Sequence, residues 1–226
     1  MTAILPFSHA RSDRWQRHAQ RLRRSESGMA LVEFAMVLPF LMIMATSALE
    51  LTNYAITVKR VGELGVMVSD NASRMGAQSA INNKPISEAE INDVFIGADL
   101  QASGLNLAAN SRIILSSLQL NSDGGQTIKW QRCFGSVAYS SAYGAQGTGA
   151  TGTGFAGMGP TGKQLKAAAG TAVMFVEIRY RYKRLMPLFW LPLSDITETS
   201  AFNVRDSRDL TTVYNTENVT ASTCSA

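Results

Sequence analysis

Histidine, on which many nucleophilic and metal-dependent sites rely, occurs only twice in this chain. His9 and His18 both precede the segment that could build a folded domain. Catalysis by Ser-His-Asp or Cys-His and histidine-containing metal sites each need a histidine within the site. The two cysteines are too few for a zinc site. We therefore expect no catalytic residue, no metal site, no cofactor and no enzymatic activity.

Acid pairs leave one catalytic alternative open. Glu88 with Glu90, or Asp206 with Asp209, could serve a hydrolase that uses carboxylates alone. Both pairs lie among serine, asparagine and arginine, which favours a solvated surface. Gly144 to Gly162 contains eight glycines and no charge, and it predicts a mobile loop. Its glycine spacings resemble nucleotide-binding loops only weakly.

A long apolar segment runs from Met29 to Leu51, with Glu33 and Glu50 as its only charged residues. A helix rises about 1.5 Å per residue, so this segment can cross a hydrocarbon core of roughly 30 Å. The segment predicts one transmembrane helix. It is longer than the apolar core of a cleavable secretory signal, which has about 7 to 15 residues.

The positive charge of the chain is concentrated ahead of this helix. Residues 1–28 contain six arginines and two acids, which accounts for the whole net charge of +4. A short basic segment beside a membrane helix sets orientation, so we expect a cytoplasmic N-terminus and a periplasmic domain after the helix. Because the remainder is neutral, we expect no nucleic-acid partner.

The sequence Gly28-Met29-Ala30-Leu31-Val32-Glu33-Phe34-Ala35, followed by Pro39, resembles the start of the TadE-like proteins. These are minor pseudopilins of the tight-adherence (Flp-type IV) pilus assembly system. The resemblance covers roughly residues 23–76, and Met29 stands where major prepilins carry phenylalanine. It implies that a prepilin peptidase cleaves between Gly28 and Met29, five residues before Glu33, and leaves the membrane helix on the mature protein.

Glu33 is costly in a membrane, by up to about 3 kcal/mol at the bilayer centre, so it needs a partner. The resemblance implies that Glu33 meets the N-terminal amine of a neighbouring subunit during assembly. A shallow acid, favoured by the helix dipole and by headgroup water, is the alternative. The implied partners are the prepilin peptidase, other pilin or pseudopilin subunits, inner-membrane assembly proteins and membrane lipid.

Beyond Leu51 an apolar stripe repeats every three or four residues and predicts that the helix extends over residues 52–80. A periplasmic domain over residues 81–226 should follow. Its expected elements are a capped helix from Ser87 to about Leu100, a hairpin of Arg112–Leu120 with Gln126–Cys133, a strand within Thr171–Leu185 with one buried face, and strands Ile196–Val204 and Leu210–Tyr214. The fold class is α+β and pilin-like.

Two further features concern the domain's surface and its stability. The apolar stretch Met186–Leu193 is too short to span a membrane; it either touches the membrane surface or a partner, or folds over the sheet. Cys133 and Cys224 lie after the membrane helix, in an oxidising compartment. A disulfide between them would contribute about 4.6 kcal/mol in the chain-entropy model, with free or intermolecular thiols as the alternative.

Together these patterns predict a single-pass protein of the bacterial inner membrane that works as a non-enzymatic pseudopilin-like subunit. An uncleaved, membrane-anchored periplasmic binding module is the alternative function. Such a module would use the glycine-rich loop and Met186–Leu193 as its binding surface, and its isolated domain would bind a ligand.

Overall fold

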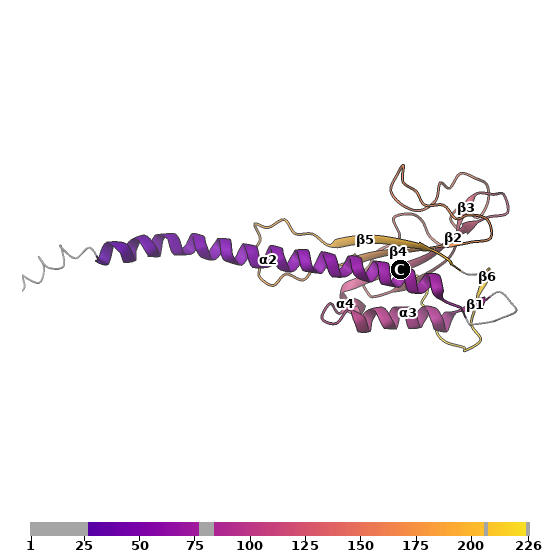
Figure 1. The fold of residues 1–226 in the computed structure, drawn as a ribbon, viewed down its shortest axis with the longest axis horizontal. Helices are drawn as coiled ribbons and strands as arrows, with labels where there is room; N and C mark the ends of the chain where they lie inside the picture. The colour runs from indigo at the N-terminus through magenta and orange to yellow at the C-terminus, as the bar shows by residue number, and fades with distance from the viewer. Residues whose placement is uncertain (1–26, 77–83, 206–207, 225–226) are drawn as a thin grey trace, which may run out of the picture. The chain divides into compact units, whose positions relative to one another are not determined.

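The computed structural model describes residues 27–76, 84–205 and 208–224 (Figure 1). The order of elements is α2 (Ser27–Arg74), β1 (Lys84–Ser87), α3 (Glu88–Gln101), α4 (Leu107–Asn110), β2 (Ser111–Leu120), β3 (Gln126–Phe134), β4 (Val173–Tyr180), β5 (Ile196–Asn203) and β6 (Arg208–Tyr214). A long apolar helix followed by a small domain with an antiparallel sheet confirms the predicted α+β class. The boundary between two compact units falls between Leu49 and Glu50.

The second half of α2 belongs to the domain and packs along its apolar stripe. Five stripe residues are buried in the main core: Val61, Leu64, Val68, Ala72 and Met75. Gly65 lets the helix approach the sheet closely, since a β-carbon there would lie 3.5 Å from Ser200 and 3.6 Å from Ile178. The Ser69 and Ser200 hydroxyls are 2.8 Å apart, which links α2 to β5. The predicted stripe is confirmed.

The end of α2 comes earlier than predicted. The helix stops at Arg74, and Gly76 follows with a positive φ of 120°, a conformation that glycine adopts without steric cost. The predicted extension to residue 80 is therefore wrong for residues 75 and 76, and its last residues lie outside the described ranges. The apolar stripe gave no sign of this stop, because Met75 still continues its spacing.

Helix α3 begins with the predicted capping box. The Ser87 hydroxyl accepts from the backbone N–H of Glu90, and the Glu90 carboxylate accepts from the backbone N–H of Ser87. Ile91, Phe95 and Ala98 then face the same core as α2. Strand β1, which immediately precedes the cap, was not predicted; it pairs in parallel with β6.

The main sheet has the order β3-β2-β4-β5, and all of its neighbours are antiparallel. Strands β2 and β3 form the predicted hairpin. The Asn121 side chain closes its turn by accepting from the backbone N–H groups of Asp123 and Gly125. The final strands β5 and β6 also lie where the sequence places them, within two residues at each end.

Strand β4 is buried on both faces, so the prediction of one buried face is wrong. On one face Met174, Val176 and Ile178 pack in the main core with α2 and α3. On the other face Val173 and Phe175 form a second, smaller core. A strand covered on only one side would expose alternate residues, and here a second layer covers them.

The second layer comes from the glycine-rich loop at residues 144–162 and its flanks. Met158 of this loop is fully buried against Leu118, Ile128 and Phe175. The Asn121 amide donates to the carbonyl oxygens of Gly149 and Gly152, at 2.9 and 2.7 Å. The sequence predicted a mobile loop; the structure shows a segment folded on the sheet. Glycine allows it, because backbone segments meet there with no room for side chains.

Candidate functional site

The predicted processing and assembly residues lie at the start of α2. Gly28, Met29 and Glu33 are all exposed, and a β-carbon at Gly28 would meet no atom within 4 Å. Residues 1–26 of the leader, including Arg23 and Arg24, lie outside the described ranges. Gly28 and Glu33 are thus on one continuous helix, with open space around the glycine.

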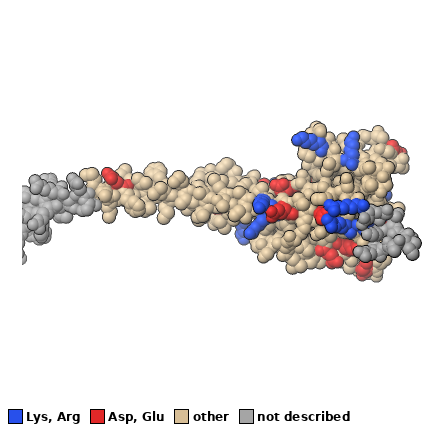
Figure 2. Space-filling view, viewed as in Figure 1, with Lys and Arg blue, Asp and Glu red and all other residues tan. Residues whose placement is uncertain are grey.

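The first part of α2 presents an almost uncharged surface (Figure 2). Every residue from 28 to 45 is exposed, and most of these residues are large and apolar. The helix has a mean hydropathy of 2.1 over its most apolar window, with none of that window buried. A helix in water would normally bury an apolar surface of this size against the rest of the protein. The helix is therefore long enough and apolar enough to cross a membrane.

Glu50 ends this exposed run and is almost fully buried, with 1% of its surface exposed. Its carboxylate accepts hydrogen bonds from the Tyr182 hydroxyl at 2.9 Å and from the backbone N–H groups of Leu185 and Met186, both at 3.1 Å. Buried carboxylates need such donors, because desolvation is otherwise costly. The predicted membrane segment extended to Leu51; the structure instead places Glu50 inside the domain.

Tyr182 connects this carboxylate to the next turn of α2. Its hydroxyl donates to Glu50 and accepts from the Asn53 side-chain amide at 2.7 Å, and its ring meets the Tyr54 ring edge-on at 4.9 Å. Burial raises the pKa of Tyr182 above its usual value, and the hydrogen bond to Glu50 adds to that rise. The phenol therefore stays protonated at neutral pH and remains a donor. We call Glu50, Asn53 and Tyr182 the Glu50 cluster.

The sequence drew attention to Glu33 and missed the function of Glu50. One signal was present: an acid at the end of an apolar run needs a partner. Its actual partners lie more than 130 positions away in the chain, which no local pattern indicates. The Glu50 cluster therefore appears only in the folded structure.

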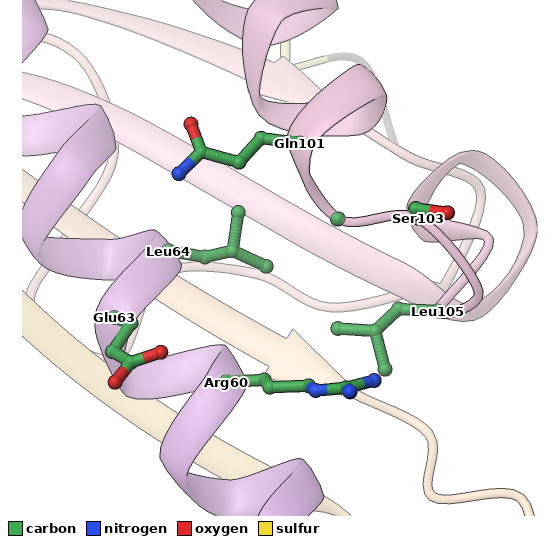
Figure 3. A pocket seen from close by; sticks show the side chains of 7 residues that line it. Arg60, Glu63, Leu64, Gln101, Ser103 and Leu105 are labelled. Carbon is green, nitrogen blue, oxygen red and sulfur yellow. The ribbon is translucent and has the colours of Figure 1, made fainter.

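Beside this cluster α2 borders two open hollows of the domain. Arg60, Glu63 and Leu64 line the first, of about 440 Å³, together with Gln101 and Leu105 (Figure 3). Figure 3 shows the Arg60 side chain extending from α2 toward Leu105. Arg60 also lines the second hollow, of about 450 Å³. The first hollow holds one acid, Glu63, and one base, Arg60.

A second buried carboxylate, Glu177, lies on the face of β4 under the second layer. It accepts from the Ser141 hydroxyl and from the Ala142 backbone N–H, the latter at 2.9 Å. Burial raises the pKa of Glu177, and these two hydrogen bonds partly oppose that rise. Glu177 thus holds the segment at residues 141–142 on the sheet.

The other candidate residues have structural partners. Glu88 forms a buried ion pair with Arg132, and Glu90 belongs to the helix cap. Asp209 accepts from Thr211 and Tyr214, while Asp206 lies outside the described ranges. Among the described residues, no group of three or more histidine, cysteine or acidic side chains could hold a metal ion.

Cys133 and Cys224 form a disulfide, with their α-carbons 4.9 Å apart. The C-terminal segment also accepts a backbone hydrogen bond here: the Ser222 carbonyl oxygen accepts from the Cys133 N–H at 2.7 Å, beside an isolated antiparallel bridge between Thr223 and Arg132. The pair is the one that the sequence proposed. The disulfide fastens the last described residues to the edge strand β3.

Comparisons with family models, with curated proteins and with solved structures found no match to this chain.

Proposed function

We propose that this chain is a non-enzymatic pseudopilin-like component of a tight-adherence (Flp-type IV) pilus assembly system. In this proposal a prepilin peptidase cleaves after Gly28, the helix stays in the bacterial inner membrane, and the domain is displayed in the periplasm. The protein then assembles through its N-terminal helix with other pilin or pseudopilin subunits. The resemblance of the N-terminal sequence to TadE-like proteins and the exposed apolar surface of α2 both support this proposal.

The observation that carries this proposal is the exposed apolar half of α2, which begins directly after a basic leader and a glycine. Such a helix needs lipid or other apolar helices around it. Glu33 lies on it as an acid in an otherwise apolar surface, where a cationic partner would lower its cost. A new amine on Met29, about one helical turn away, is the type of partner that cleavage would create in each subunit.

Substitutions in cells can separate the two roles. Gly28→Val should abolish leader removal, because the peptidase must accommodate a residue without a side chain next to the cut. Glu33→Gln should leave leader removal intact and reduce assembly, measured as cross-linking between helices of neighbouring subunits and as pilus formation. The two variants therefore fail at different steps.

Glu63→Gln is a matched control for Glu33→Gln. Glu63 is an exposed acid on the same helix, and its ion pair with Lys59 at 3.6 Å is of a kind worth less than about 1 kcal/mol. This variant should process and assemble normally. Leader removal and pilus formation that survive both Gly28→Val and Glu33→Gln would contradict the proposal.

A further inference from the structure

The segment at residues 185–193, which we call the aromatic loop, is held by the first residue after the exposed apolar run of α2. Glu50 accepts from the backbone N–H groups of Leu185 and Met186. Phe189 lies only three residues beyond Met186, so its α-carbon is at most about 10 Å from that of Met186. The loop is thus tethered at the position where a transmembrane helix would leave the hydrocarbon core.

Hydrogen bonds from Arg184 fix the shape of the aromatic loop, and the aromatic residues at its tip are exposed. Arg184 donates to the carbonyl oxygens of Leu188 and Leu193, at 2.7 and 2.9 Å, and Leu188 is buried. By contrast Phe189 is 89% exposed and Trp190 is 46% exposed, and their rings meet edge-on at 5.1 Å. A braced loop with an exposed Phe-Trp tip costs free energy in water.

Basic side chains lie next to this loop. The second hollow, of about 450 Å³, is lined by Arg60, Lys183 and Arg184 together with asparagine and tyrosine side chains, and no acidic residue is among its lining residues. Its lining also includes Leu185, the first residue of the aromatic loop. A positive, hydrogen-bonding hollow beside an exposed aromatic pair suits an anionic headgroup.

We propose that the aromatic loop and the second hollow dock on the anionic phospholipid surface of the membrane that α2 enters. Phe189 and Trp190 occupy the headgroup region, Trp190 as the amphipathic indole that is enriched there and Phe189 as additional apolar area. Arg60 and Lys183 face the lipid phosphates. This inference rests on the membrane anchoring of α2 and is independent of leader cleavage and of pilus assembly.

The length of the tether fits a lipid surface as the occupant. Each headgroup layer is roughly 5 to 8 Å thick, given about 40–45 Å for the whole bilayer and 30 Å for its core. The tip lies at most about 10 Å from Met186, whose backbone N–H donates to Glu50 directly after the last apolar residue, so the headgroup layer is within its reach.

The test uses the full, uncleaved chain in lipid nanodiscs with or without phosphatidylglycerol. Both natural cysteines are in the disulfide, so Phe189→Cys provides a single thiol for an environment-sensitive fluorophore. Leu165→Cys is the control: Leu165 is also an exposed apolar residue, and it contacts Met158, which packs beside the opposite end of β4. The label at 189 should be quenched several-fold more strongly than the label at 165 by nitroxide-labelled lipid.

A second readout leaves the aromatic pair intact. Quenching of Trp190 by brominated lipid in the unlabelled protein, with Trp190→Phe as the baseline for the other tryptophans, should be substantial and should increase with phosphatidylglycerol. The double variant Arg60→Gln, Lys183→Gln should reduce the part of this quenching that depends on phosphatidylglycerol. The underlying docking equilibrium should weaken by roughly fivefold for each charge removed. Arg184 is left unchanged because it braces the loop.

Equal quenching at positions 189 and 165, with no quenching of Trp190, would overturn the docking proposal. Quenching that is unchanged by phosphatidylglycerol and by the two Gln substitutions would overturn the role of the second hollow. Neither result depends on processing or on pili, so either can occur while the pseudopilin proposal stands.

Discussion

Replacing Glu50 with alanine should release the aromatic loop while leaving the sheet folded. The substitution removes the acceptor for three donors: the Tyr182 hydroxyl and the N–H groups of Leu185 and Met186. Hydrogen bonds to a charged group contribute about 1.5–3 kcal/mol each. The full sum does not apply, because donors freed by an opened loop regain water.

We therefore expect Glu50→Ala to destabilise the closed conformation of the aromatic loop, relative to the open one, by about 2–4 kcal/mol. This corresponds to the loss of one or two of the three hydrogen bonds. Each 1.4 kcal/mol is a tenfold change in an equilibrium constant. Hydrogen exchange of the Leu185 and Met186 amides should accelerate at least tenfold. Exchange of the β4 amides should change little, since β4 is held by pairing with β2 and β5.

Tyr182→Phe provides the matched control. It removes one donor to Glu50 and the acceptor of Asn53, yet it keeps the ring and both backbone bonds. We expect about 1 kcal/mol, and so a smaller acceleration at the same two amides. Unchanged exchange in Glu50→Ala, or equal acceleration throughout the sheet, would refute the assignment of Glu50 as the local tether.

Three further predictions concern the domain. Burial raises the pKa of Glu177, so the folded state binds the Glu177 proton more tightly than the unfolded state does. The free energy of unfolding should therefore fall as the pH rises from the usual glutamate range through that raised pKa. Denaturation curves of Glu177→Gln, measured over the same pH range, should lack this fall. Replacing Cys133 and Cys224 with serine should lower the free energy of unfolding by up to about 4.6 kcal/mol and release the C-terminal segment to limited proteolysis, whereas unchanged cleavage would argue against the tether. In thermal unfolding, Gly149→Ala should destabilise the protein far more than Gly147→Ala. Both glycines have positive φ, a conformation that costs alanine about 1–2 kcal/mol. Only at Gly149 would a β-carbon also clash, because it would lie 2.2 Å from the Gln126 carbonyl oxygen. Equal losses for the two glycines would exclude the clash.

Local patterns predicted most of the fold because each depends on neighbours in the chain. The capping box at Ser87 requires only the residues up to Glu90, and the turn before Gln126 requires only the preceding residues. The stripe on α2 likewise follows from helical spacing. These elements were correct within a few residues.

The failures share a physical cause, which is contact between distant segments. The second face of β4 is buried because a loop without regular structure folds over it, and glycine content alone suggested mobility. Strand β1 depends on a partner, β6, that lies more than 120 residues away. Glu50 seemed part of an apolar run until its donors at residues 182–186 were known.

The N-terminus of the protein in native membranes tests most directly whether this chain enters the prepilin pathway. N-terminal sequencing with intact-mass measurement should show a mature chain that begins at Met29 and retains the whole apolar segment of α2. A chain that begins at Met1 or Thr2 would contradict entry into this pathway. It would favour instead an uncleaved, membrane-anchored periplasmic binding module.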